Sequence, residues 1–207
     1  MKVFIGTPSY AANLSVDYVR SVVETAIVLT ANGVPMEHHV LCGSPFLGKA
    51  RNDLVDRFLK SECDNLLFLD SDVGFDVRNL IRVLNHKQEI VGGLVPKRDS
   101  KHEDAFHQNA LTGVIENGLF QSLELPTAFM RIKRSAFEKL DKPYFRAESS
   151  EDAFGEDIYF CRKWVAKGEH FWIDSDIDFS HTGEYIWRGN FYEHCIKSGL
   201  LTKTEAA

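Results

Sequence analysis

The sequence predicts an α/β fold, with a mostly parallel central sheet flanked by helices. Segments typical of strands and helices alternate over residues 3–69, the pattern of parallel strands joined by helical crossovers. The uncharged run at 66–69 indicates a buried strand that leads directly into Asp70-Ser71-Asp72. The 207 residues are 44% hydrophobic and 26% charged, as in an ordinary globular protein, and we expect one domain over residues 1–207.

The first half of the chain is expected to alternate strictly between strand and helix. Ser15 is a suitable N-cap for the first helix, and Asn32-Gly33 a suitable end. The second helix has a buried stripe that includes Leu54 and Phe58. The pair Gly92-Gly93 indicates a close approach of the backbone to a neighbour. We expect strands at residues 3–5, 35–41, 66–69 and 89–95, and helices at 15–31, 48–60 and 77–84.

The pattern changes after Pro96, where a charged, aperiodic loop is expected over residues 97–108. Glu116-Asn117-Gly118 is a type I′ turn signal between two short strands, 111–115 and 119–120. Beyond it we expect strands at 127–132 and 171–174, and helices at 133–140 and 155–168. The tail from Ser180 is rich in aromatic residues that suit core packing, a homodimer contact, or stacking on sugar rings or bases: Tyr185, Trp187, Phe191 and Tyr192.

Charge, cysteines and hydropathy argue against several classes of protein. A formal net charge of −6 gives no electrostatic reason to expect a nucleic-acid backbone or an anionic membrane surface as main partner. The four cysteines form no C-x-x-C pair, which is typical of reduced thiols in an intracellular protein. The apolar run at 3–5 is too short for a signal peptide, and no stretch approaches the roughly 20 apolar residues of a membrane span. We expect a cytoplasmic protein.

The pair Asp70 and Asp72 is the clearest chemical signal. Side chains alternate along an extended chain, so both carboxylates leave the strand on the same side. Open α/β sheets bind ligands beyond the carboxyl ends of their strands. Two like charges there are costly unless a cation lies between them, which favours a hard divalent metal shared with a phosphate. The alternative is a surface turn that contains two aspartates.

Other polar groups are expected at the same edge of the sheet. Thr7-Pro8-Ser9-Tyr10 follows the first strand, where a nucleotide would lie, although taken by itself the segment is better explained as a plain turn. Arg51 and Asn52 lie near the start of the second helix, where a guanidinium can pair with a diphosphate or a base edge or simply be solvated.

Glu156 and Asp157 begin a later helix, whose dipole favours carboxylates there whether or not they act as a base. His181 follows an acidic stretch. A lone histidine is usually structural, but with Asp72 it would form a mixed site suited to manganese or magnesium.

Taken in order, these motifs resemble a glycosyltransferase of the GT-A fold, most similar to the small, family-two-like members of bacterial or viral type. The resemblance rests on Leu69-Asp70-Ser71-Asp72, Gly155-Glu156-Asp157 and His181-Thr182-Gly183. It spans about residues 3–184, with supporting segments at 7–8, 49–52, 91–98 and 127–134. Thr127-Ala128 departs from the glycine-containing turn of many relatives.

The resemblance implies a role for each matching residue. Residues 1–96 would form the nucleotide-binding half and residues 97–207 the acceptor and catalytic half. Asp72, Asp70 and His181 would hold Mn²⁺ or Mg²⁺, Asp157 would deprotonate the acceptor hydroxyl, and Glu156 would position a sugar. The residues expected to contact the nucleotide sugar, a UDP- or GDP-sugar, are Thr7, Pro8, Tyr10, Arg51, Asn52, Asp70, Ser71 and Lys97.

The acceptor stays open among a glycan, a protein, a lipid-linked sugar and a modified nucleic-acid base, and inverting and retaining chemistry are both compatible with the sequence. Two other functions fit parts of the pattern. A phosphohydrolase of the haloacid-dehalogenase type would use Asp70 as nucleophile and Asp72 as acid and base, but its motif usually lies on the first strand. A non-catalytic module that binds nucleotide sugars or glycans is the other alternative.

Overall fold

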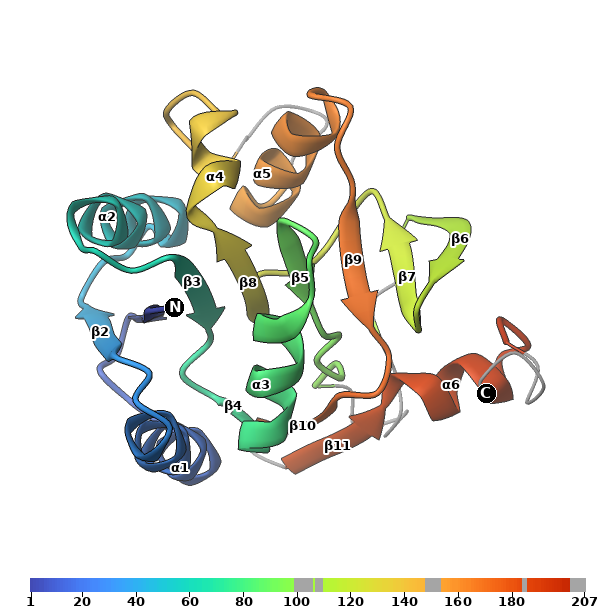
Figure 1. Ribbon diagram of the computed structural model, residues 1–207, viewed down its shortest axis with the longest axis horizontal. Coiled ribbons are helices and arrows are strands. Elements are labelled where there is room, and N and C mark those ends of the chain that lie inside the picture. Colours follow the sequence, from blue (N-terminus) through green and yellow to red (C-terminus); the bar gives the residue numbers. More distant parts are fainter. Residues whose placement is uncertain (99–105, 107–109, 148–153, 184–185, 202–207) are drawn as a thin grey trace.

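A computed structural model describes residues 1–98, 106, 110–147, 154–183 and 186–201 of the chain. Within these residues the chain forms an eight-stranded sheet, a three-stranded sheet and flanking helices (Figure 1). The strands are β1 (Val3–Ser9), β2 (Met36–Cys42), β3 (Asn65–Leu69), β4 (Val73–Phe75), β5 (Ile90–Gly92), β6 (Leu111–Glu116), β7 (Leu119–Ser122), β8 (Phe129–Lys133), β9 (Phe171–Asp174), β10 (Asp178–Thr182) and β11 (Ile186–Asn190). The helices are α1 (Val16–Ala31), α2 (Leu47–Lys60), α3 (Val77–Asn85), α4 (Arg134–Glu138), α5 (Glu156–Val165) and α6 (Phe191–Lys197).

The large sheet has the strand order β2-β1-β3-β8-β5-β9-β7-β6. β1 pairs in parallel with β2 and β3, and β5 pairs in parallel with β9. β8 is antiparallel to both β3 and β5, so β1, β2, β3, β5 and β9 all run in one direction. The prediction of a mostly parallel central sheet is confirmed, and the carboxyl ends of these five strands share one edge.

Alternating side chains divide the core into two layers, one on each face of the large sheet. Phe4, Leu66 and Phe68 point into a cluster with helices α2, α4 and α5. The residues between them in the sequence, such as Ile5 and Leu67, point into a second cluster with helices α1 and α3. Because both faces are covered, the strands carry uninterrupted apolar runs, which is why the sequence signal at residues 66–69 was strong.

The small sheet has the order β11-β10-β4, with antiparallel pairing throughout. None of its strands was predicted, nor was α6. β4 has three residues and follows the acidic pair directly, which is too short for a periodic signal to appear. This sheet matters for the site because His181 of β10 pairs with Val73 of β4, and the Thr182 amide donates to the Asp72 carbonyl over 2.8 Å.

The strand predicted at 89–95 is shorter than expected, since β5 ends at Gly92. Gly92 pairs with Met130, the second residue of the neighbouring strand β8, which begins at Phe129. Beyond Gly92, β5 therefore has almost no partner strand with which to form hydrogen bonds. A Cβ on Gly92 would lie 2.3 Å from the Phe129 carbonyl oxygen, and one on Gly93 would lie 2.6 Å from the Phe179 ring. The close approach indicated by the glycine pair is confirmed, and the approaching groups are protein.

The aromatic tail is at least partly core. Phe191 at the start of α6 is buried, and its ring centroid lies 5.5 Å from that of Phe106 and 5.9 Å from that of Phe120. Tyr192 is partly buried against the same cluster. Tyr185, the side chain of Trp187 and most of the loop predicted at 97–108 lie outside the described residues. All four cysteines are free thiols, and no helix in the described ranges has both the length and the apolar character needed to cross a membrane.

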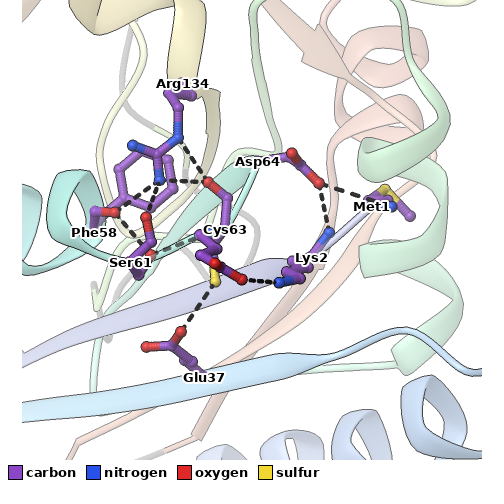
Figure 2. Close-up of polar contacts among 9 residues, drawn as sticks. Met1, Lys2, Glu37, Phe58, Ser61, Cys63, Asp64 and Arg134 are labelled. Carbon is purple, nitrogen blue, oxygen red and sulfur yellow. Dashed lines mark hydrogen bonds and ion pairs between the residues drawn. The ribbon is translucent and has the colours of Figure 1, made fainter.

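Arg134, at the start of α4, fastens the end of α2 to the sheet (Figure 2). Its guanidinium donates hydrogen bonds of 2.6–3.1 Å to the carbonyls of Phe58, Leu59, Ser61 and Cys63. Phe58 and Leu59 lie in the last turn of α2, where a helix leaves carbonyls short of intrahelical partners, and Ser61 and Cys63 belong to the chain that follows it. The chain then enters β3, so this arginine sets where α2 stops and where the strand before Asp70 begins.

We predict that Arg134→Ala lowers the free energy of unfolding by about 2–4 kcal/mol, because several carbonyls lose a charged donor at once. Urea denaturation followed by circular dichroism measures the change. Lys60→Ala, which removes an exposed cation from the last turn of the same helix, serves as control and should change the free energy by less than about 0.5 kcal/mol. Equal effects of the two substitutions would contradict a capping role for Arg134.

Candidate active site

A cleft of about 530 Å³ lies at the edge of the large sheet where its parallel strands end. Asp70 follows β3, residues 95–98 follow β5, and α2 and α5 contribute residues from their first two turns. This is the position at which open α/β sheets bind ligands. Its described lining is Leu47, Arg51, Asp70, Val95, Pro96, Lys97, Arg98, Pro126, Thr127, Ala128, Glu156, Asp157 and His181.

Arg51 joins three elements at the floor of the cleft. Its side chain, 2% exposed, donates from Nη2 to Asp70 Oδ1 over 3.0 Å and from Nε to Glu156 Oε1 over 3.2 Å. Its guanidinium carbon lies 5.2 Å from the centre of the Phe68 ring. A buried cation is stable only when paired, and here one carboxylate comes from the end of β3 and the other from the start of α5.

One nitrogen of the same guanidinium has no partner. Arg51 Nη1 is buried and makes no hydrogen bond with any described group. Buried polar atoms are nearly always paired, and an unpaired donor on a charged group is especially costly. Because Arg51 lines the cleft, this donor is a candidate contact for a ligand oxygen.

Asp72 lies next to the cleft, in contact with two residues that line it. Its Oδ2 accepts a hydrogen bond from Arg98 Nη1 over 3.0 Å and lies 3.6 Å from His181 Nε2. Burial raises the pKa of the Asp72 carboxyl, but His181 and Arg98 outweigh it and hold the pKa below its ordinary value. Asp72 is therefore a carboxylate at neutral pH.

His181 is held in an orientation suited to metal binding. Its Nδ1 donates to the Pro96 carbonyl over 2.7 Å, which leaves Nε2 directed toward Asp72. A ligating histidine usually donates its other ring N–H to such a carbonyl. Pro96 had no predicted role, and its only sequence signal was its position after the glycine-containing strand.

The donor set fits a divalent cation that is shared with a phosphate. Among the described residues, no group of three or more His, Cys, Asp or Glu is close enough to hold a metal without other ligands. Asp70, predicted as a further metal ligand, accepts a hydrogen bond from Arg51 through Oδ1. Asp72 and His181 together suit Mn²⁺ or Mg²⁺, because Mg²⁺ commonly binds one or two carboxylates and takes its remaining ligands from phosphate and water.

Glu156 and Asp157 both line the cleft from the first turn of α5. Glu156 accepts a hydrogen bond from Arg51, while Asp157 Oδ1 accepts a hydrogen bond from the Ile158 amide over 2.8 Å. The helix start thus places two negative charges beside the cleft, where the dipole favours them. Only Asp157 of the pair has no cation as its hydrogen-bond partner among the described contacts.

Five of the residues predicted to bind the nucleotide are not part of the described cleft lining: Thr7, Pro8, Tyr10, Asn52 and Ser71. Thr7 is buried, and its hydroxyl hydrogen-bonds the Tyr18 hydroxyl over 2.7 Å. Tyr10 is exposed, and the Ser71 carbonyl accepts from the Ser15 amide. Asp70, Arg51 and Lys97 do lie at the cleft.

Asn52 shows why neighbours in a helix need not share a role. Successive residues turn by about 100°, so when Arg51 faces Asp70, Asn52 faces the chain after α4. Its side chain donates to the Phe145 carbonyl over 2.7 Å and accepts from the Tyr144 amide over 2.9 Å. In this structure Asn52 braces that segment.

Comparisons with known proteins agree with this architecture. No protein-family model matches the sequence, and no curated protein matches it. Among solved structures, the protein A197 from STIV is similar with a TM-score of 0.62 and 20% identity over 92% of this chain and 95% of that one.

Residues 1–349 of TarS from S. aureus, in complex with UDP-GlcNAc, have a TM-score of 0.53 and 15% identity, over 91% of this chain and 58% of the TarS chain. A Drosophila β-1,4-galactosyltransferase 7 variant in complex with manganese, UDP-Gal and xylobiose has a TM-score of 0.50 and 13% identity, over 92% of this chain and 73% of that one. The fold of this chain is the GT-A fold, as the sequence motifs predicted.

We predict that Glu156→Gln lowers the free energy of unfolding by about 1–2 kcal/mol, because the buried Arg51 loses one of its two compensating charges while the volume is kept. Asp53→Asn is the control, since it removes a carboxylate from α2 whose ion pair with Lys49 is exposed. Urea titration of both variants at low and high salt measures the difference. A Glu156→Gln protein as stable as the parent would show that Arg51 does not depend on this carboxylate.

Proposed function

We propose that this protein is a metal-dependent glycosyltransferase that moves a sugar from a nucleoside-diphosphate sugar to an acceptor hydroxyl. The observation that carries the proposal is the buried, unpartnered Nη1 of Arg51 in a cleft at the carboxyl edge of a GT-A sheet. A guanidinium fixed on two sides, with one donor free, suits an oxygen of a nucleotide or its diphosphate.

The donor would lie across Arg51 and Asp70, with its diphosphate toward Asp72. Asp72 and His181 would hold Mn²⁺ or Mg²⁺ there, and the bound ion would neutralise the charge that develops on the diphosphate as it leaves. Lys97 and Arg98 also line the cleft and add positive charge, and Arg98 contacts Asp72. UDP- or GDP-sugars are the proposed donors, and the complexes of TarS with UDP-GlcNAc and of the galactosyltransferase with manganese and UDP-Gal support this choice.

Asp157 is the proposed base for the acceptor. Its carboxylate would take the proton of the acceptor hydroxyl, the hydroxyl oxygen would bond to the anomeric carbon, and the bond from that carbon to the diphosphate oxygen would break with its electron pair. Glu156 positions Arg51, and with it the donor, through the 3.2 Å hydrogen bond between them. This assignment corresponds to an inverting reaction, whereas a retaining path needs no base at that position.

The test follows release of free nucleoside diphosphate from a panel of UDP- and GDP-sugars, with and without Mn²⁺ and with simple glycosides as acceptors. We predict metal-dependent release that falls by about 100-fold or more in Asp72→Ala, because the leaving group loses its cation. Asp53→Ala is the matched control, an exposed carboxylate away from the cleft that should leave release unchanged. Phosphate release from simple phosphomonoesters without any nucleotide-sugar turnover would instead identify a phosphohydrolase.

A second variant separates catalysis from binding. Asp157→Asn should keep the affinity for the nucleotide, measured by titration calorimetry with UDP or GDP and Mn²⁺, and lose transfer by about 100-fold or more because the acceptor proton has no base. Unchanged transfer would remove Asp157 as base. Nucleotide-sugar binding by the parent protein with no turnover for any acceptor would favour the non-catalytic binding module.

A further inference from the structure

Helix α1 carries an apolar stripe on the side that faces solvent. Val16, Val19, Val23 and Ile27 are 75%, 43%, 52% and 63% exposed. With 3.6 residues per turn, these positions fall on one face of the helix. The opposite face, which includes Tyr18, Val22 and Leu29, is buried against β4, α3 and the sheet. α1 thus has apolar residues on two opposite faces, of which one is buried in the core and the other is exposed to solvent.

The stripe is unusual for a surface that stays in water. Single exposed apolar residues are common, but contiguous patches mark interaction sites. Valine and isoleucine are also weaker helix formers than alanine, leucine, lysine or glutamate, so this choice does not strengthen the helix. In Figure 1, α1 lies at the outer margin of the molecule. No described residue of α1 belongs to the lining of the candidate active site, so the stripe is separate from the proposed catalytic cleft.

One positive and one negative side chain flank the stripe, so the charges of one copy of α1 can pair with those of a second copy. Arg20 and Glu24 lie four residues apart along the same flank of the helix, and both line a hollow beside it. The Arg20 side chain is 65% exposed, and its ion pair with Asp17 is 3.6 Å long. If two copies of α1 pack antiparallel about a two-fold axis at the level of residue 22, midway between Arg20 and Glu24, Arg20 lies opposite Glu24 of the partner subunit, and symmetry repeats that ion pair.

We propose that α1 is the interface of a homodimer in which two apolar stripes pack antiparallel and the Arg20–Glu24 pairs fix their register. A membrane surface fits less well, because helices that lie on membranes carry a polar face rich in Lys and Arg. α1 has one arginine against Asp17 and Glu24, and the whole chain has a formal net charge of −6. The helix has 16 residues, or about 24 Å, so its interface is smaller than the roughly 800 Å² per subunit of stable complexes. The dimer is therefore of modest affinity and dissociates on dilution.

Analytical ultracentrifugation of the full chain over about 1–200 μM tests the proposal, since a Kd in the micromolar range corresponds to a modest free energy of association. We expect a concentration-dependent shift from monomer to dimer that Val23→Glu abolishes. Val114→Glu is the matched control, because Val114 is a 47% exposed valine on β6, outside α1, and its substitution should leave the dimer intact. Circular dichroism and thermal melts establish that each variant is folded.

A charge exchange tests the register. Arg20→Glu and Glu24→Arg should each weaken the dimer by about 3- to 10-fold in Kd, and the double variant should restore it because the pair is re-formed with reversed sign. A monomer at every concentration, a dimer insensitive to Val23→Glu, or a double variant no tighter than the single ones would overturn the proposal. Monomeric protein that binds anionic vesicles through α1 would overturn it as well.

Discussion

Two carboxylates that lie far apart in the sequence, Asp70 and Glu156, share the buried guanidinium of Arg51. Loss of either carboxylate would destabilise the fold, because an arginine that is only 2% exposed is stable only while its charge is compensated. The interaction therefore fixes three elements relative to one another: the end of β3, the first half of α2 and the start of α5. The cleft exists where these three meet, and its remaining walls are arranged around that fixed point.

The sequence was sufficient for the fold class and for the elements with long apolar runs. Residues 66–69 were recognised as a strand because both of its faces are covered, and the α1 boundaries because Ser15 caps the helix through its side chain. The small sheet could not be found in this way. β4 and β10 are short, and they are stabilised by pairing with each other rather than by local propensity, so only the folded chain reveals them.

The candidate site shows the same division. Asp70, Asp72, Arg51, Glu156, Asp157 and His181 all lie in the cleft or in contact with its lining, because each occurs at or near the end of an element whose position the fold determines. Asn52 and Thr7 were chosen for their sequence position alone, and their side chains turned out to be committed to the Phe145 backbone and to Tyr18. A residue next to a site residue in a helix or strand generally points elsewhere, and no sequence pattern reveals which contact it makes instead.

The pairing of β4 with β10 has a consequence for how the protein is made. It brings His181 to within 3.6 Å of Asp72, although more than 100 residues separate them in the sequence. A nascent chain that has not yet reached β10 can build β1, β2 and β3 and display the acidic pair, but it has no imidazole beside Asp72. Pairing between strands so distant in sequence must close a long loop, which makes it slow to form. The pair of Asp72 and His181 therefore forms only once β10 has folded onto β4. A chain that ends before β10 would lack the imidazole of the proposed metal site.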